Sequence, residues 1–432
     1  MSRSDAKPTL WRAGALLFAL TTVLALALAL KLWLRLDESG ELIRDPALVD
    51  MPKPLPDERV LRAVSFEDLP GWTSDTVGDA LPAWRRTCAR YRFLAPDRDV
   101  RPGEIGGTVS DWSKACAATP KGNDDDKARR FFESEFAVLQ VLNRKETRGL
   151  FTGYYEPLLY GSRARSSRYS TPLYRNPGDM ISVDLGAFRD DLDGRSVAGR
   201  LRGKRLLPYW DRGEIRGGAL GGRGLELLWV DDPVDAFFLQ IQGSGQVEIA
   251  GGGRLRVGYA GQNGHAYYAI GRELIERGAL TRENVSLQTI RAWLEANPDE
   301  AEAVMATNRS FVFFREIQGE GPIGSLGVAL TPERSLAVDR RFLPLGAPVF
   351  LSAEHPTEDG EGTETLRRLL IAQDTGGAIR GPVRGDVFWG AGERAEEIAG
   401  RMKHEGELFL LLPKPLAERA LATEEAAVAT DA

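Results

Sequence analysis

The chain has 432 residues, of which 43% are hydrophobic and 27% are charged, and it contains 47 glycines and 24 prolines. This composition excludes a disordered or collagen-like chain and leaves room for two or three folded domains. The formal net charge of −6 gives no sign of a nucleic-acid-binding surface, so we expect no nucleic-acid partner.

The N-terminus carries an uncharged apolar run from Ala13 to Leu30, preceded by Arg3, Lys7 and Arg12 and ended by Lys31. As a helix this run is about 27 Å long, which is just enough to cross a membrane. We predict that residues 1–36 are a membrane anchor. A cleaved signal peptide is the alternative, because residues 25–29 contain Ala-x-Ala sites. In both cases the basic N-terminus stays in the cytoplasm and the body is exported.

Residues 37–58 contain four prolines among mixed charges and are predicted to be a linker. Residues 416–432 are rich in Ala and Glu and are predicted to form a disordered tail. The chain has two cysteines, Cys88 and Cys116. They could form a disulfide in an oxidising compartment, or they could be two buried thiols.

Hydrophobic periodicity predicts a mainly β protein with peripheral helices. Three aspartates precede an apolar pattern that predicts a helix over Asp124–Asn143. Residues 150–260 divide into short β-rich segments, such as Leu225–Val230 and Ala236–Ile241, which are typical of a barrel or sandwich. Further helices are predicted at 265–277, 286–296 and 299–307, and further strands at 311–314, 325–330, 336–338, 349–351, 369–372 and 387–389.

Two aspartates are candidates for acid–base chemistry. Asp374 follows an apolar strand and enters a Gly-rich turn, and Asp386 begins the next predicted strand. If the two carboxylates converge at one end of a barrel, one pKa rises and a general acid at neutral pH becomes possible. The alternative is that both only cap turns. The single Asp-Thr-Gly triplet does not suffice for an aspartic protease, which needs two such aspartates.

Several ordered motifs resemble those of the membrane-bound lytic murein transglycosylase A family. The resemblance extends in order from about residue 60 to residue 413. It rests on Phe151–Pro157, Phe237–Gly245, Gly258–Gly264 and Asn308–Phe314, and on a three-aspartate module formed by Leu336–Gly346, Gln373–Gly377 and Gly385–Phe388.

The resemblance implies a double-ψ β-barrel with a second β-barrel inserted into it and a groove for a glycan strand between them. Residues 59–157 and 309–415 would form the first barrel, and residues 158–308 the inserted one.

The resemblance also implies cleavage of the β-1,4 bond between N-acetylmuramic acid and N-acetylglucosamine in peptidoglycan, with formation of a 1,6-anhydro-muramic end. Asp386 would be the general acid and base, Asp374 would assist it, and Asp339 would be structural. No metal or organic cofactor is expected, since the three histidines match no zinc pattern. A hydrolytic glycosidase that uses Asp374 and Asp386 with a water, and a non-catalytic peptidoglycan-binding scaffold, are the alternatives.

Glycan binding needs aromatic faces and amide or hydroxyl partners. Seven candidates come from the motifs, although about half of them would serve ordinary packing instead. We expect Trp389 in the core and Glu156 in a structural pair, with a second acid as the alternative for Glu156. The Arg-rich stretch 195–223 is expected on a solvated loop, and attraction to carboxylates on the peptide stems of the wall is the alternative. The seven candidates are Tyr154, Tyr155, Gln240, Gln242, Ser244, Gln262 and Asn263.

No cysteine follows the apolar N-terminal run, so the chain cannot be lipidated there. We therefore expect an inner-membrane anchor with the body facing the periplasm. Secretion to the periplasm after signal cleavage is the alternative.

Overall fold

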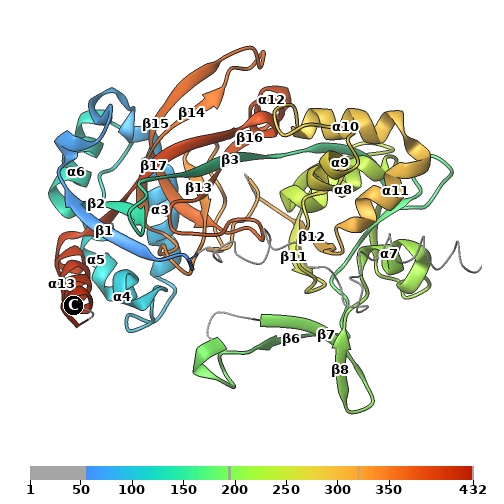
Figure 1. Ribbon diagram of the computed structural model, residues 1–432, viewed down its shortest axis with the longest axis horizontal. Coiled ribbons are helices and arrows are strands. Elements are labelled where there is room, and N and C mark those ends of the chain that lie inside the picture. Colours follow the sequence, from blue (N-terminus) through green and yellow to red (C-terminus); the bar gives the residue numbers. More distant parts are fainter. Residues whose placement is uncertain (1–54, 193–195, 320, 431–432) are drawn as a thin grey trace, which may run out of the picture. The chain divides into compact units, whose positions relative to one another are not determined.

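The computed structural model describes residues 55–192, 196–319 and 321–430 of the chain (Figure 1). The predicted anchor at 1–36 and most of the predicted linker at 37–58 lie outside these residues. From Asp57 onward the chain forms one compact unit. Among the described residues, no helix combines the length and the apolar character that crossing a membrane requires.

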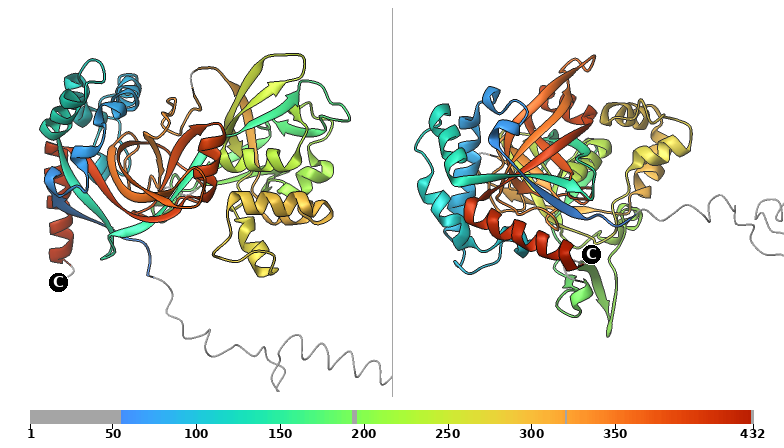
Figure 2. Two further views of the ribbon diagram at one scale, coloured as in Figure 1. Left: turned by 90° about the horizontal axis from the view of Figure 1, so that it is seen from above. Right: turned by 60° about the vertical axis from the view of Figure 1, so that its left-hand side comes forward.

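The larger sheet has eight strands in the order β1, β2, β17, β14, β15, β13, β16, β3, and β17 also pairs with β3. This extra pairing closes a ring that runs from β17 through β14, β15, β13, β16 and β3 back to β17 (Figures 1 and 2). Apolar side chains from every strand of the ring fill its core. The strands are β1 (Arg59–Val64), β2 (Phe136–Asn143), β3 (Arg148–Glu156), β13 (Ser335–Val338), β14 (Pro348–Pro356), β15 (Thr363–Asp374), β16 (Gly385–Ala391) and β17 (Lys403–Pro413).

Between β3 and β13 the chain forms a second sheet with its own hydrophobic core. The strand order is β12, β11, β10, β4, β9, β5, and an isolated bridge from Arg175 to Phe314 links its two edges. A separate three-stranded sheet is formed by β6 (Met180–Asp184), β7 (Ser196–Arg202) and β8 (Arg205–Pro208). The strands of the second sheet are β4 (Leu158–Ser162), β5 (Thr171–Tyr174), β9 (Glu226–Val230), β10 (Ser244–Ile249), β11 (Arg254–Gln262) and β12 (Val312–Ile317).

The three helices predicted between 265 and 307 are confirmed, with shorter bounds for the first. They are α9 (Ile270–Glu276), α10 (Leu287–Ala296) and α11 (Pro298–Thr307). The remaining α-helices are α3 (Leu81–Tyr91), α4 (Gly103–Gly106), α5 (Val109–Ala118), α6 (Asp125–Glu135), α7 (Arg212–Glu214), α8 (Pro233–Gln242), α12 (Glu393–Arg401) and α13 (Lys414–Thr430). Short 3-10 turns lie at Phe66–Asp68, Trp72–Ser74, Val77–Ala80 and Asp190–Leu192, and a π turn at Ile215–Ala219.

The strand predicted over Ala236–Ile241 is wrong, because these residues belong to helix α8. Asp232 caps the helix by accepting hydrogen bonds from the backbone N–H groups of Val234 and Asp235, and Pro233 occupies its first turn. Gly243, with φ of +82°, ends it. These start and stop signals outweigh the β propensity of the phenylalanines between them.

The helix predicted over Asp124–Asn143 is correct only in its first half. Asp124 caps α6 by accepting from Lys127 N–H at 2.9 Å, and the helix ends at Glu135. From Phe136 the chain is β2, which pairs with both β1 and β17, so sheet pairing overrides the helical period. The strand predicted at 325–330 is also absent there, and only a bridge from Ile323 to Ala329 is present.

The disordered tail predicted at 416–432 is also wrong for the described residues. Helix α13 covers Lys414–Thr430 and packs on β1, β2 and β17. Leu416, Ala417 and Ala420 are buried in the main core. The apolar face of this helix outweighs its disorder-like composition.

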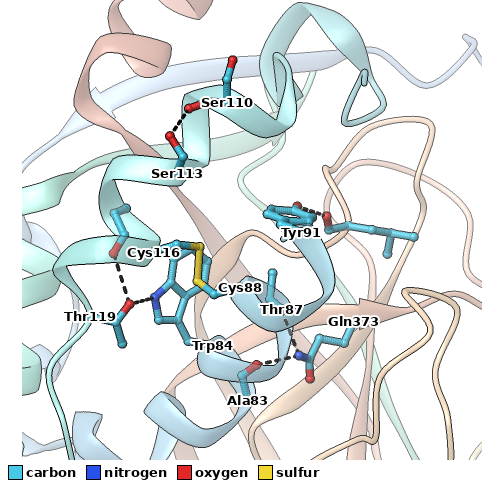
Figure 3. The surroundings of a disulfide bond; sticks show 12 residues. Ala83, Trp84, Thr87, Cys88, Tyr91, Ser110, Ser113, Cys116, Thr119 and Gln373 are labelled. Carbon is cyan, nitrogen blue, oxygen red and sulfur yellow. Dashed lines mark hydrogen bonds between the residues drawn. A yellow bond between two sulfur atoms is a disulfide. The ribbon is translucent and has the colours of Figure 1, made fainter. Parts of the chain in front are cut away.

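Helices α3 and α5 are joined by a disulfide between Cys88 and Cys116 (Figure 3). The indole N–H of Trp84 donates to the Thr119 hydroxyl at 2.9 Å beside it. On the other side of α3, the buried Gln373 amide donates to Ala83 O and to the Thr87 hydroxyl (Figure 3). The disulfide-bonded helix pair is therefore fastened to the end of β15.

We predict that replacing both cysteines by serine lowers the free energy of unfolding by about 3–4 kcal/mol, because the crosslink closes a loop whose ends are 28 residues apart. Guanidinium titration measures the loss, and reductant should cause the same loss in the unchanged protein. A loss below about 0.5 kcal/mol would contradict this role of the crosslink.

Candidate active site

The two candidate aspartates lie in one row across neighbouring strands. Ala337 of β13 pairs with Asp374 of β15 on one side and with Asp386 of β16 on the other. The row continues from Asp386 to Thr152 of β3 and from Thr152 to Lys403 of β17. Since adjacent strands are about 4.8 Å apart, the backbones of the two aspartates are about 10 Å apart. Ala337, whose side chain is only a methyl group, lies between the two aspartates.

Both carboxylates are on the face of the sheet that points away from the main core. Along β16, Val387 and Trp389 are in the main core, whereas Asp386 and Phe388 alternate to the other face. Along β13, Ala337 likewise leaves the main core, in contrast to its two neighbours. A small separate cluster of Tyr154, Leu330, Ala337, Ile379 and Phe388 covers this face.

Asp374 is surrounded by donors. Its carboxylate accepts from Ser325 N–H, from the Ser325 hydroxyl and from Thr375 N–H, each at 2.9 Å, and from the Tyr154 hydroxyl at 3.0 Å. Ser325 reaches it because Gly324 has no side chain: a Cβ there would lie 2.6 Å from Gln373 O. The register shift between β13 and β15 just before Asp374 marks a bulge that reorients this side chain.

Asp386 has a different environment. Its carboxylate accepts one described hydrogen bond, from the Thr152 hydroxyl at 2.7 Å. The guanidinium of Arg384 donates to the same hydroxyl at 2.9 Å. Thr152 is thereby oriented with its proton toward Asp386. No described residue donates a hydrogen bond to the second oxygen of Asp386.

Burial raises the pKa of both aspartates above its ordinary value. For Asp374 the four donors work in the opposite direction, because they stabilise the ionised form. For Asp386 only Arg384 and Thr152 lower the pKa, and the charge of Asp374 raises it further. The phenol of Tyr154 is kept protonated, since burial and both carboxylates raise its pKa well above the ordinary value.

Tyr267, from the segment between β11 and α9, borders the aspartates from the side of the second sheet. Its Cβ would lie 3.9 Å from a Cβ placed on Gly377, in the turn after Asp374. Burial raises the pKa of Tyr267, and the charge of Asp386 raises it further. Tyr267 is not among the predicted site residues, although it follows the Gly258–Gly264 motif by three residues.

Asp339 is held inside the fold. Its carboxylate forms an ion pair with Arg341 at 2.5 Å and accepts from Gly381 N–H at 3.0 Å. Burial raises its pKa, but these donors outweigh burial and keep the pKa below the ordinary value. Asp339 is thus engaged by Arg341 and Gly381, and its structural role stays a prediction.

The seven candidate binding residues are not gathered at the aspartates. Tyr154 is there, whereas Tyr155 is buried in the main core and its N–H donates to Gln242 Oε1 at 3.1 Å. Asn263 is fully buried and donates to the carbonyls of Trp210 and Arg309. Gln262 is exposed at the end of β11.

Gln240 and Ser244 are buried, and Gln240 lines a small separate cavity beside Arg212. Trp389 is in the core as predicted, and Glu156 pairs with Arg256 at 2.5 Å as expected. Thr152, Ser325 and Arg384 were missed. Thr152 and Arg384 lie within or directly beside the quoted motifs, so proximity to a motif was the available signal.

Comparison with known proteins assigns the family. Residues 150–315 match the MltA specific insert domain, and residues 334–412 match the 3D domain. The membrane-bound lytic murein transglycosylase A of Escherichia coli K12 is 35% identical over 349 residues, which cover 79% of this chain and 85% of that protein. The chain belongs to the membrane-bound lytic murein transglycosylase A family.

A second member of this family, from Vibrio cholerae, is 36% identical over 273 residues, which cover 62% of this chain and 66% of that protein. A crystal structure of a membrane-bound lytic murein transglycosylase from Agrobacterium tumefaciens superposes with a TM-score of 0.74 at 36% identity. It covers 83% of this chain and 99% of that chain.

We predict that Asp386→Asn stabilises this family member at pH 7. An unfolded aspartate loses its proton near pH 3.9, whereas the folded Asp386 keeps it to higher pH. Stability therefore falls as pH rises between the two values, by about 1.4 kcal/mol per pKa unit. Asparagine does not ionise, so the gain should be present at pH 7 and vanish below about pH 4 in thermal unfolding.

Asp339→Asn is the matched control. The pKa of Asp339 is lowered in the fold, so its ionised form stabilises the protein above the unfolded pKa and this contribution is lost as pH falls. The control should be less stable than the unchanged protein at pH 7. Equal pH dependence of stability for Asp386→Asn and the unchanged protein would contradict the environment described for Asp386.

Proposed function

We propose that the protein is a lytic transglycosylase that cleaves the β-1,4 bond between N-acetylmuramic acid and N-acetylglucosamine in peptidoglycan and leaves a 1,6-anhydro-muramic end. Its family relatives are named lytic murein transglycosylases. The observation that carries the proposal is the unequal pair of aspartates: Asp374 has four donors and Asp386 has one. The donors of Asp374 favour its ionised form, and the charge of Asp374 raises the pKa of Asp386, so we assign the proton that the pair retains to Asp386.

The first step needs an acid. Asp386 donates its proton to the glycosidic oxygen as the bond to C1 of the muramic ring breaks and positive charge develops there. The ionised Asp374, two strands away, raises the proton affinity of Asp386 and stabilises the positive charge electrostatically. Thr152 fixes one oxygen of Asp386, so the other is directed at the substrate.

The second step needs a base, and the same group supplies it. The carboxylate of Asp386 takes the proton from the C6 hydroxyl of the muramic ring while that oxygen bonds to C1, which restores the acid. Because nucleophile and electrophile are in one sugar, the effective concentration of the hydroxyl far exceeds that of a diffusing reactant. One carboxyl group therefore suffices for a full cycle.

The hydrolytic alternative is less well supported. A second carboxylate would have to act as nucleophile or activate a water. Asp374 is poorly suited to both roles, because its oxygens already accept hydrogen bonds from Ser325, Thr375 and Tyr154. A non-catalytic scaffold would have no use for a desolvated carboxyl group, whose burial destabilises the fold.

For the architecture, we propose that the closed ring of β17, β14, β15, β13, β16 and β3 is a double-ψ β-barrel. The second sheet, whose edges meet at the bridge from Arg175 to Phe314, is proposed as the inserted barrel. Because β12 belongs to the second sheet, the insert extends to Ile317, beyond the boundary at 308 that the sequence predicts, and the first barrel resumes at β13. Exposed Gln262 and the aspartate-side Tyr154 remain our candidates for contact with the glycan among the predicted residues.

We further propose that the body faces the periplasm and is held at the inner membrane by residues 1–36. The named relatives are membrane-bound, and the disulfide between Cys88 and Cys116 suits an oxidising compartment. Peptidoglycan, the proposed substrate, is in that compartment.

We expect Asp386→Asn to lower kcat for murein lysis by at least about a hundredfold, because a general acid and base contributes that much or more. Asp374→Asn is the control and should retain more activity, since Asp374 only assists Asp386. Mass spectrometry of the digest should find sugar ends one water lighter than reducing ends. Wild-type lysis by Asp386→Asn, or reducing ends only, would overturn the proposal.

A further inference from the structure

A cavity of about 680 Å³ is lined by residues of helices α8, α9 and α10 and of the turn from α12 into β17. Its walls are mostly apolar, with Phe237 and Ile241 from α8, Ile270 and Ile275 from α9, and Ile290 from α10. A wall of this kind offers few hydrogen bonds to sugar hydroxyl groups. It matches a ligand with methyl groups.

The cavity is adjacent to the aspartates at two points. Tyr267 lines it and also borders the turn after Asp374, where it approaches Gly377. Lys403 lines it as well and stands in the same strand row as Asp386, separated from it only by Thr152. A substituent of a sugar bound at Asp386 would therefore reach the cavity over a distance of about two strand spacings, or 10 Å.

The rim of the cavity is cationic. Arg272 stacks over Tyr268 and, like Arg282, forms no ion pair with a carboxylate of the described residues. The ammonium group of Lys403 donates to the carbonyls of Arg282, Glu283 and Val285 at 3.0–3.2 Å, which fixes this wall without neutralising the charge. Glu276 lines the cavity as its one acid, and Glu283 lies beside Arg282 outside the lining.

We propose that this cavity binds the peptide stem that the muramic residue carries, with the alanine methyl groups against the apolar wall and the stem carboxylates at Arg272 and Arg282. The inference rests on the proposed function and extends it from the glycan bond to the substituent beside that bond. The murein peptide stem is short, rich in alanine and anionic, which complements both the wall and the rim.

The wall around this cavity is held in place before any ligand binds. Gln288 of α10 donates to the carbonyl of Glu396 in α12, and Arg291 of α10 lies 3.9 Å from the Glu396 carboxylate. Together with Lys403, these contacts tie the helices of the second sheet to the ring of strands. A preformed pocket loses less ordering entropy on binding than one that must assemble.

The test uses the full chain and two substrates: murein strands with peptide stems, and the same strands after an amidase has removed the stems. The variant is Arg272→Ala with Arg282→Ala. Its matched control is Arg92→Ala with Arg98→Ala, two exposed arginines at and after the end of α3, which changes net charge equally. The rate of release of 1,6-anhydro ends gives kcat and KM for each protein on each substrate.

We expect the cavity variant to raise KM about fivefold on peptide-bearing strands, with kcat and the peptide-free reaction unchanged, and the control to change neither. An unchanged KM on peptide-bearing strands, or an equal rise on both substrates, would overturn the cavity proposal while leaving the proposed reaction intact. Absence of anhydro ends from both substrates with the unchanged protein would instead overturn the proposed function.

Discussion

The site depends on the backbone pairing of one short strand. β13 is hydrogen-bonded in parallel to β15 and antiparallel to β16, so Ala337 faces Asp374 on one side and Asp386 on the other. Two aspartates twelve positions apart in the chain are thereby fixed on one face at a set separation. A slip of one residue on either side would turn one carboxylate into the hydrophobic core, where an isolated charge is strongly disfavoured. Only this register gives Asp374 and Asp386 the unequal environments that suggest a general acid and its electrostatic partner.

The rest of the ring serves to keep that register. Gln373, the residue before Asp374, is fully buried and bonded to α3 and to the Ser335 hydroxyl, so the end of β15 is anchored to both a helix and β13. The disulfide between α3 and α5 restrains that helix. On the open face, Gly324 lets the loop with Ser325 close over Asp374. The contacts that stabilise the fold therefore lie on the core side of the row of paired residues, and the two carboxylates lie on the opposite side.

The sequence predicts the β-rich character and the helices at 265–307, and it singles out Asp374 and Asp386, which the fold brings into one row. Each has a local signal, either a Gly-rich turn after an apolar strand or a clear hydrophobic period. The predictions from sequence failed where tertiary contacts determine the secondary structure. Phe136–Asn143 continues a helical pattern but is recruited as a strand by β1 and β17. The 236–241 segment has strand-like residues but is capped by Asp232 as a helix. Tyr267 could not be assigned, since only the fold brings it near Asp386.

The most direct test of the central claim is a titration of the two carboxyl carbons by NMR in protein labelled with ¹³C-aspartate, with each signal assigned through its loss in Asp374→Asn or Asp386→Asn. The account predicts that the Asp386 carbon titrates at the higher pH of the two, and above the ordinary value of about 3.9. If Asp386 titrates at its ordinary value while Asp374 holds its proton to higher pH, the roles given to these two residues are wrong.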